Sequence, residues 1–263
     1  MGYSKEILLE QFIQEYIKLK EPIGSEMLKN SLELKISSAT IRNYFKVLMD
    51  EGILIQPHIS SGRIPTHFAM KNYWRQKINI NKNFKILDDK QLLHQICKKH
   101  QIFLLLKEDI SQKLTQVLNI ENNFLILVFE KGKILLDYQA RMEKFLQELI
   151  GLDIQEIKKI AYQVMANTLL KKINYLQNDK VTYFALEVLD SFISCPYYQD
   201  LFFNIIKGDI FDKCANGILF DPIFPENYMG ILHDGLQQEK NIKMLCVGYL
   251  TADYETFYEQ IAA

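Results

Sequence analysis

The sequence predicts a multidomain α+β protein with a helical amino-terminal part and a larger carboxyl-terminal part that mixes helices and strands. The chain has 263 residues, which suggests about two domains. Apolar side chains recur with a helical period near the amino terminus, whereas later apolar runs are short and strand-sized. Hydrophobic residues make up 48% of the chain and charged residues 24%, a balance that supports a buried core.

The first predicted helix runs from about Ser4 to Leu19. Its core stripe follows the i, i+3, i+4, i+7, i+8 pattern in Leu9, Phe12, Ile13, Tyr16 and Ile17. The sequence Lys20-Glu21-Pro22 ends this helix. A shorter helix from Ser25 to about Asn30 is expected to bury Met27 and Leu28.

The third predicted helix, within residues 37–52, is the most informative segment because its two faces differ. At about 100° per residue, one face is apolar and the other is short, polar and cationic. The apolar face carries Ile41, Phe45 and Leu48, and the polar face carries Ala39, Arg42, Asn43 and Lys46. Ser37 is suited to cap this helix and Gly52 to end it. The polar side chains are of the kind that read base edges in the DNA major groove.

A hairpin is predicted after the third helix. Residues 53–59 have the apolar, β-branched character of a strand, and residues 60–63 have turn chemistry. Three helices followed by a hairpin form a winged helix-turn-helix, with Arg63 expected at the wing tip, near a phosphate or the minor groove. A lone amphipathic helix is usually a solvated face, so the order of the elements carries this prediction.

Specific residue identities in the same region resemble the amino-terminal domain of the HrcA family of heat-inducible transcription repressors. The matching strings are Pro22-Ile23-Gly24-Ser25, Ser38-Ala39-Thr40-Ile41-Arg42-Asn43, Leu48, Glu51-Gly52 and Pro57-His58-Ile59-Ser60-Ser61-Gly62-Arg63-Ile64-Pro65-Thr66. Lys71, Tyr73 and residues 149–157 match the family more weakly. The resemblance implies a winged helix-turn-helix at 1–78, a linker at 79–91 and a GAF-like α/β domain at 92–263. It also implies an inserted dimerising segment at about 140–225, expected to be reduced.

The resemblance implies a homodimeric repressor of chaperone operons that binds an inverted-repeat operator in double-stranded DNA. It also implies that the GroE chaperonin keeps the repressor active. Arg42 and Asn43 are expected to read bases and Lys46 to bind a phosphate. The expected DNA-binding residues are Ser38, Ala39, Thr40, Arg42, Asn43, Lys46, His58, Ser60, Ser61, Gly62, Arg63, Thr66 and Lys71.

Two features depart from the family. Residues 247–254 keep Gly248, Asp253 and Tyr254 but lack the Pro, Arg and Met that the family tends to carry there. The chain is also shorter than family members generally are, and the deficit is expected between about 140 and 235.

The formal net charge of −1 conceals an uneven distribution. Residues 1–85 hold 13 Lys and Arg against 8 Asp and Glu, a net +5, which leaves a net −6 for residues 86–263. Three of the four arginines lie within residues 36–77. A modest positive charge at the helical end favours attraction to DNA phosphates.

The remaining elements are predicted from periodicity. A helix over 66–78 is expected to bury Phe68, Tyr73 and Trp74. Strands are predicted at 102–106, 123–130, 133–138 and 243–250, the middle two forming a hairpin across Lys131-Gly132. Helices are predicted at 142–149, 154–176, 183–193, 200–207 and 227–238. The aromatic stretch 197–203 is interpreted as a core helix, with a dimer contact as the alternative.

No catalytic or cofactor-binding signature is found, so neither an enzyme nor a cofactor is expected. His94, Cys97 and His100 have a suggestive spacing, but a structural zinc site needs four ligands, so no metal is expected and a solvated helix is predicted. Asp88-Asp89 are adjacent and cannot share a face, which favours a linker or a helix start.

The start of the chain leads into an amphipathic helix rather than a signal peptide, and no apolar run is long enough to span a membrane. The four scattered cysteines are expected to be reduced thiols in a cytoplasmic protein. Two alternatives stay open. One is a regulator that senses a small molecule through its carboxyl-terminal domain, and the other is an enzyme that its amino-terminal domain tethers to DNA.

Overall fold

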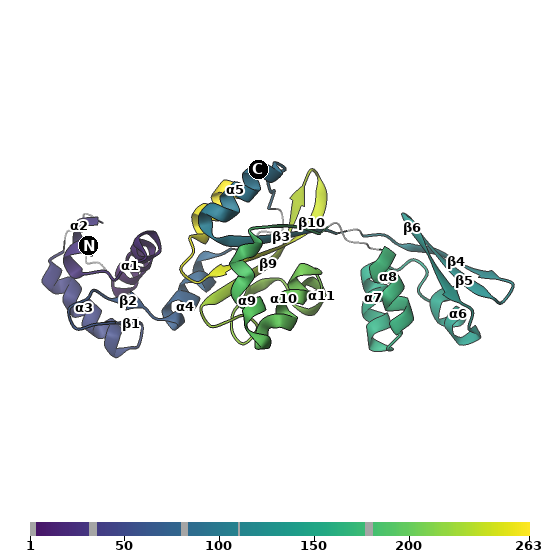
Figure 1. Cartoon of the computed structure of the whole chain (residues 1–263), viewed down its shortest axis with the longest axis horizontal. Helices are drawn as coiled ribbons and strands as arrows, with labels where there is room; N and C mark the ends of the chain where they lie inside the picture. The colour runs from purple at the N-terminus through teal and green to yellow at the C-terminus, as the bar shows by residue number, and fades with distance from the viewer. Residues whose placement is uncertain (1–3, 32–35, 80–83, 110, 177–180) are drawn as a thin grey trace. The chain divides into compact units, whose positions relative to one another are not determined.

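The computed structural model describes residues 4–31, 36–79, 84–109, 111–176 and 181–263. The chain divides into two compact units, drawn in Figure 1. The first unit joins Met1–Leu106 to Val181–Ala263, and the second is Lys107–Lys180. The second unit therefore starts and ends earlier than the inserted segment expected at about 140–225. None of the described helices is long and apolar enough to cross a bilayer.

The first unit begins with three helices, as the sequence predicts: α1 (Lys5–Leu19), α2 (Ser25–Ser31) and α3 (Ser38–Asp50). Hydroxyl groups cap α1 and α3, because the Ser4 side chain accepts from the Ile7 amide and the Ser37 side chain from the Thr40 amide. Gly52 adopts a φ of 70°, which ends α3 in the left-handed region as predicted.

These helices enclose a small apolar core. The rings of Phe12 and Phe45 meet edge to face with their centroids 5.3 Å apart. Leu28 is fully buried, but the prediction that Met27 is buried is wrong, since that side chain is 41% exposed. The short α2 has room for only one inward-facing apolar side chain, which is Leu28.

A two-stranded hairpin and a fourth helix follow α3. Strand β1 (Leu54–Ile55) pairs antiparallel with β2 (Ile64–Pro65), so the strand predicted over 53–59 is shorter than expected. Helix α4 (His67–Lys77) begins at its cap Thr66 and buries Tyr73 and Trp74, as predicted. The prediction for Phe68 is wrong, because it is exposed while Ala69 and Met70 face inward.

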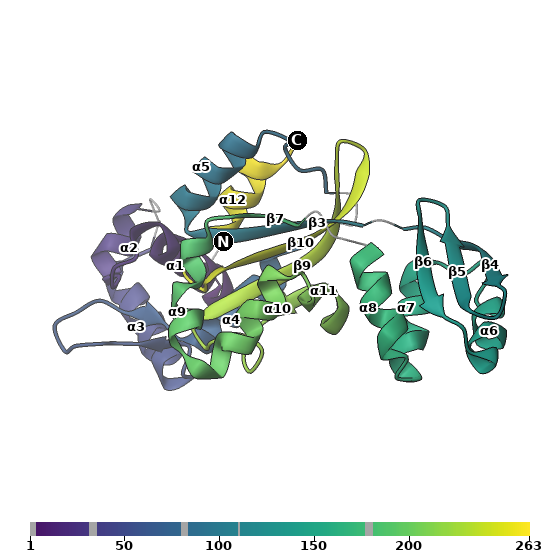
Figure 2. The same ribbon diagram turned by 45° about the vertical axis from the view of Figure 1, so that its right-hand side comes forward.

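The larger part of the first unit is a five-stranded sheet in the order β7-β3-β10-β9-β8. The strands are β3 (Ile102–Glu108), β7 (Val181–Phe184), β8 (Gly217–Leu219), β9 (Tyr228–Gln237) and β10 (Lys240–Tyr249). Helices α5 (Lys90–His100) and α12 (Tyr254–Ile261) cover one face in Figure 2. The other face is covered by α9 (Asp190–Ser194), α10 (Gln199–Ile206) and α11 (Ile210–Lys213), with the 3-10 turns η1 (Leu186–Leu189) and η2 (Pro196–Tyr198).

Strand β3 shows how the sheet separates two cores. Ile102, Leu104 and Leu106 pack with α5 and α12, whereas Phe103 and Leu105 pack with the helices on the opposite face. A strand alternates its side chains between the two faces, so a strand that is covered on both sides reads as a continuous apolar run. The run 102–106 is therefore confirmed as a buried strand.

Several predictions for the carboxyl-terminal part are wrong. The helix predicted at 227–238 is strand β9, which pairs over its whole length with β10. The helix predicted at 183–193 is divided among β7, η1 and α9. Part of the predicted linker 79–91 is packed, because Lys85 and Ile86 bridge to Leu236 and Ala262. Asp89 caps α5, which confirms a helix start at Asp88-Asp89.

The second unit consists of a three-stranded antiparallel sheet and three helices. The strands are β4 (Leu114–Ile120), β5 (Phe124–Phe129) and β6 (Gly132–Asp137), and the helices are α6 (Ala140–Gln147), α7 (Ile154–Gln163) and α8 (Asn167–Leu176). The predicted hairpin across residues 131–132 is confirmed by the pairing of β5 with β6. The single helix predicted at 154–176 is broken between α7 and α8, where Met165 takes a φ of 55°.

Candidate nucleic-acid interface

Helix α3 presents the polar face that the sequence predicts. Its apolar residues Ile41, Phe45 and Leu48 are at most 1% exposed. The exposed residues on its other side are Ala39, Thr40, Arg42, Asn43 and Lys46, with Ser38 half-buried at the helix start. This helix is held by its buried face, so its polar face is displayed on a fixed support.

Both ends of α3 are fixed by side chains. At its start, the hydroxyl oxygens of Ser37 and Thr40 lie 2.9 Å apart and share a hydrogen bond. At its end, the Lys5 ammonium forms an ion pair of 2.7 Å with the Glu51 carboxylate, which joins the end of α3 to the start of α1. This surface ion pair orients the helices more than it stabilises them.

Arg42 is partly oriented within the helix. Its Nε donates to the Ser38 carbonyl oxygen at 3.3 Å, one turn earlier. The guanidinium presents several donors in a rigid fork, and such a fork matches the two acceptors of guanine in the major groove. Ser38 therefore positions the arginine as well as starting the helix.

The hairpin loop, residues 56–63, is held together by two of its own side chains. The Gln56 amide donates to the carbonyl oxygens of Ile59 at 2.8 Å and Ser61 at 3.0 Å. The Ser61 hydroxyl donates to the His58 carbonyl oxygen at 2.8 Å and accepts from the His58 amide at 3.0 Å. These bonds order the loop tip although the strands below it are short.

The base of the hairpin loop is fastened to the turn between α1 and α2. Ile23 and Arg63 exchange two main-chain hydrogen bonds of 2.9 Å each. Gly62 approaches the same turn so closely that a Cβ atom there would lie 2.5 Å from the Ile23 carbonyl carbon. Only glycine permits this approach of two backbones.

The prediction that Arg63 forms the loop tip is wrong. Its main chain is paired with Ile23 at the base, and its guanidinium carbon lies 5.6 Å from the ring centroid of Phe45. Its Nε is buried and finds no hydrogen-bond acceptor in the part of the chain that the structure describes. The exposed end of the loop carries His58, Ile59 and Ser60 instead.

Two other residues expected at a DNA interface are engaged within the protein. The Thr66 hydroxyl donates to the Gly52 carbonyl oxygen at 3.0 Å and accepts from the Ala69 amide at 3.2 Å. The Lys71 ammonium forms an ion pair with the Asp221 carboxylate, and its side chain is only 13% exposed. Hydrogen bonding to Lys71 lowers the pKa of the Asp221 carboxyl.

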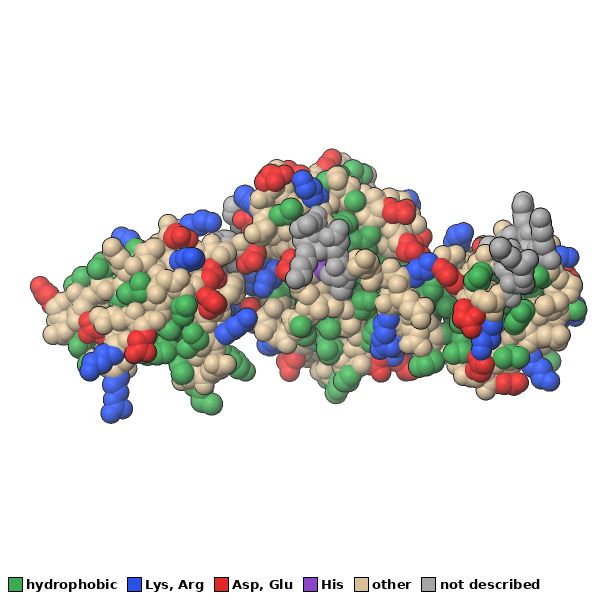
Figure 3. Space-filling model, turned by 180° about the vertical axis from the view of Figure 1, so that it is seen from behind, with side chains coloured by type: hydrophobic (Ala, Val, Ile, Leu, Met, Phe, Trp, Pro, Cys, Tyr) green, Lys and Arg blue, Asp and Glu red, His purple; other side chains and the backbone are tan. Residues whose placement is uncertain are grey.

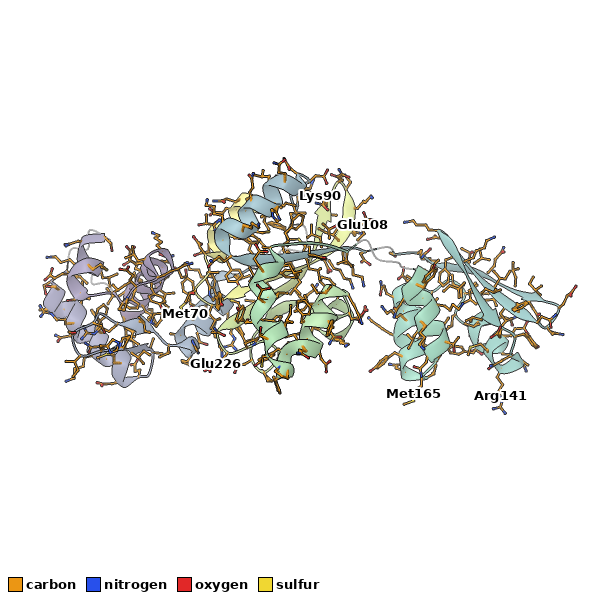
Figure 4. All side chains as sticks on the ribbon, viewed as in Figure 1. Met70, Lys90, Glu108, Arg141, Met165 and Glu226 are labelled. Atoms are coloured by element: carbon orange, nitrogen blue, oxygen red, sulfur yellow. The ribbon has the colours of Figure 1, made fainter. Side chains whose placement is uncertain are left out.

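Helix α4 makes further contacts with the segment that precedes β9. His67 lies 3.2 Å from a carboxylate oxygen of Glu226, which Figure 4 labels beside Met70 of this helix. The guanidinium of Arg75 lies over the ring of Phe220, 4.9 Å from its centroid. At its carboxyl end, α4 contacts α1 through an ion pair between Lys77 and Glu10. This helix therefore connects the three-helix part to the sheet.

Charged side chains of both signs are interspersed over the face in Figure 3 rather than gathered into one basic patch. On α3 the exposed cations are Arg42 and Lys46. Sequence reasoning missed the role of Gln56, because its partners lie in an irregular loop whose geometry no periodic pattern describes. The tip residue Ile59 was also missed, and its apolar character within a polar turn was the available signal.

A cavity of about 280 Å³ lies where α4 ends against the sheet. Its lining includes Ile231, His233, Tyr254 and Tyr258. The His233 ring bonds to the Asp234 carbonyl oxygen and the Tyr258 hydroxyl, each at 2.9 Å. Burial lowers the pKa of His233 and raises the pKa values of Tyr254 and Tyr258, so all three groups are neutral near pH 7.

The suggestive spacing of His94, Cys97 and His100 does not bring three side chains to one place. His94 is exposed, Cys97 is fully buried and His100 is half-buried, so the prediction of a simply solvated helix is wrong for Cys97. Among the described residues, no group of three His, Cys, Asp or Glu side chains is arranged to hold a metal ion.

The stretch 197–203 is neither wholly buried nor wholly exposed. Tyr197 and Phe203 are 74% and 54% exposed, whereas Tyr198 and Phe202 pack partly against the second core of the sheet. Its interpretation as a core helix therefore holds for only part of the stretch.

The family model described as HrcA C-terminal domain matches residues 74–263. The heat-inducible transcription repressors HrcA of Helicobacter pylori strains 26695 and J99 are both 36% identical to this chain. Each match covers 98% of this chain and 94% of the relative. HrcA of Bifidobacterium longum (strain DJO10A) is 50% identical over 60 residues, 23% of this chain and 16% of its own.

A solved structure has a similar fold. The crystal structure of a hypothetical protein at 2.2 Å resolution matches with a TM-score of 0.52 and 16% identity, covering 99% of this chain and 95% of that chain. At this identity the likeness concerns the fold alone.

Proposed function

The chain belongs to the HrcA family of heat-inducible transcription repressors, and from this membership we propose that it represses heat-shock genes as a DNA-bound homodimer. Helices α1 to α3 and the hairpin would form the winged helix-turn-helix, with α3 in the major groove. The larger part of the first unit would be the GAF-like domain. The operator would be an inverted repeat, because a two-fold dimer matches two-fold DNA.

The observation that carries the proposal is the exposed polar face of α3. Arg42, Asn43 and Lys46 are exposed, whereas the apolar face of the same helix is fully buried. We assign base reading to Arg42 and Asn43 and a phosphate contact to Lys46. Ala39 supplies a methyl group, and Ser38 and Thr40 lie at the helix start, where phosphates are favoured.

The other expected contact residues take different roles in the proposal. His58 and Ser60 lie on the exposed end of the hairpin loop, and Ser61 and Gly62 shape it. Arg63 is half-buried, and it would contact a phosphate from the base of the loop through its terminal guanidinium nitrogens, because its Nε is buried. Thr66 and Lys71 would position α4 rather than bind DNA, because their polar atoms already have partners within the protein.

Dimerisation is assigned to the second unit. The turn between α7 and α8 exposes Tyr162 at 77%, Val164 at 55% and Met165 at 81%. Tyrosine and methionine are enriched at protein interfaces, and exposed apolar side chains gathered in one region mark such sites. A GroE chaperonin is the partner that family resemblance implies for regulation, and its contact surface is left unassigned.

The deciding experiment compares Arg42→Ala with Lys46→Ala on duplexes selected by the wild-type protein from a random pool. Arg42→Ala should lower the discrimination between base pairs at one position by about 1–3 kcal/mol. Lys46→Ala should weaken binding to selected and scrambled duplexes by the same factor. Recovery of a palindrome by the wild type would support both specificity and two-fold symmetry. If Arg42→Ala loses the same affinity for selected and scrambled duplexes, Arg42 contacts a phosphate and does not read a base.

A regulator gated by a small molecule is the second candidate, and the cavity beside His233 is the observation that bears on it. The cavity of about 280 Å³ lies at the small end of the range for ligand sites. Its His233 and Tyr258 bond to each other and to neighbouring groups, so they do not converge as free ligand contacts. Their pKa shifts keep them neutral, which also gives no support to an enzyme with an acid–base pair.

A further inference from the structure

The hairpin loop holds one large apolar side chain entirely in solvent. Ile59 is 101% exposed, and no large apolar side chain among the described residues is more exposed. Single exposed apolar residues are common on protein surfaces, so exposure alone assigns no role.

The backbone on both sides of Ile59 is held in place. Gln56 bonds to the carbonyl oxygen of Ile59 itself, and Ser61 bonds to both main-chain groups of His58. The loop base is joined to the helices by the two hydrogen bonds between Ile23 and Arg63. The loop therefore presents the isoleucine without the ordering cost that a flexible loop incurs on binding.

The chemistry of the loop favours a polyanion as the neighbour. The span 54–66 contains no Asp or Glu but includes His58 and Arg63. Figure 2 shows the connection between β1 and β2 projecting from the hairpin beside α3, away from the helices. A narrow projection with an apolar end and no carboxylates fits the DNA minor groove, where apolar side chains enter between base steps.

We propose that Ile59 enters the minor groove next to the major groove that α3 reads, and contacts sugars and base edges without contacting a phosphate. This inference rests on the proposed DNA-binding function. It adds to that function an apolar contact whose contribution does not depend on salt. The charged contacts of Arg42, Lys46 and Arg63 would supply the salt-dependent part.

The test measures the affinity of the full-length chain for fluorescein-labelled duplexes that the wild type selects from a random pool, over a series of salt concentrations. Ile59→Ser should weaken binding roughly tenfold, which corresponds to loss of part of one buried isoleucine side chain. For Ile59→Ser, the slope of the logarithm of affinity against the logarithm of salt concentration should equal that of the wild type. Lys46→Ala should lower the magnitude of that slope by about one per subunit. Ile59→Leu should restore most of the affinity.

The matched control is Ile55→Ser, which removes an isoleucine of the same hairpin that is 47% exposed but lies on β1. It should leave the affinity unchanged. Unchanged binding by Ile59→Ser, a changed salt slope, or an equal loss for Ile55→Ser would each overturn the minor-groove contact while leaving DNA binding intact.

Sedimentation of each variant provides the remaining readout. A changed oligomeric state for Ile59→Ser would place the side chain in a protein contact and overturn the proposal. Failure of the wild type to select any duplex would instead overturn the DNA-binding function together with the contact. Because Ile59 is fully exposed, folding of Ile59→Ser is expected to match the wild type, and circular dichroism checks this.

Discussion

The indole nitrogen of Trp74 donates a hydrogen bond of 2.7 Å to the carbonyl oxygen of Leu250, 176 residues further along the chain. The same ring meets Tyr254 edge to face, with the centroids 5.2 Å apart. Trp74 belongs to α4, whose cap Thr66 also bonds to the residues that follow α3. The helix that supports the hairpin is therefore anchored in the core of the sheet.

Replacing Trp74 by phenylalanine should lower the free energy of unfolding by roughly 2–4 kcal/mol. The change leaves the buried Leu250 carbonyl without its donor and leaves a cavity beside Tyr254. Urea unfolding followed by circular dichroism measures the effect, because Trp74 is the chain's one tryptophan and the variant loses that fluorescence signal.

Phe68→Ala is the matched control on the same helix, since that ring is 58% exposed. Its free energy of unfolding should stay within about 0.5 kcal/mol of the wild type. A similar small effect for Trp74→Phe would show that the anchor contributes little.

Gly62→Ala should detach the hairpin loop from the helices. The added Cβ would lie 2.5 Å from the Ile23 main chain, so the two hydrogen bonds between Ile23 and Arg63 would have to lengthen. Crowding of this kind costs about 1–3 kcal/mol. Thermal unfolding and hydrogen exchange at the Arg63 amide give the measurements, with faster exchange expected in the variant.

The control for that change is Gly24→Ala, one residue after Ile23. A Cβ at Gly24 meets no atom within 4 Å, so the substitution should be tolerated. Equal exchange rates at Arg63 in Gly62→Ala and the wild type would contradict the tight approach.

Local sequence signals were sufficient to predict the helix α3, but they did not predict the strand β9. Helix α3 has its own cap, its own stop and one buried face, so its pattern and its environment agree. Residues 228–233 are all buried, and pairing with β10 decides their conformation despite spacing that favours a helix. Such pairing partners cannot be read from the local pattern.

In the candidate site too, local sequence predicted some features, whereas contacts with distant residues decided others. The exposed and buried residues of α3 followed from helical geometry alone. The place of Arg63 depended on Ile23, forty residues earlier in the chain, and the place of Lys71 depended on Asp221. Turn chemistry indicated a loop at 60–63, but it did not indicate which of its residues is bonded back to the helices.

Protonation of His233 should make the stability of the folded chain depend on pH. Burial lowers its pKa from the ordinary value of about 6.5, so the unfolded chain binds a proton more readily than the folded chain. Stability is therefore fully present above pH 6.5 and is lost as the pH falls through the window below about 6.5. The free energy of unfolding in urea should decrease from about pH 7.5 to about pH 5.5.

His233→Gln should flatten this profile, whereas His94→Gln, which changes an exposed histidine, should leave it as in the wild type. The bonding partners of His233 agree with a neutral ring, because the Asp234 carbonyl can only accept and the Tyr258 hydroxyl can donate. A profile that keeps its slope in His233→Gln would assign the dependence to other groups.

The four free cysteines should differ in their reaction with iodoacetamide at neutral pH. Cys97 and Cys246 are fully buried, and burial raises the pKa of Cys246 to about 12 and also raises the pKa of Cys97. The thiolate is the reacting form, so these two should remain unmodified while the partly exposed Cys195 reacts. Burial also raises the pKa of Cys214, so this thiol should react more slowly than Cys195. Mass spectrometry after a short pulse of reagent distinguishes the four sites.

With increasing urea, Cys97 and Cys246 should become reactive together, because they share one core cluster. Labelling of either one before the sheet unfolds would show that this core opens locally.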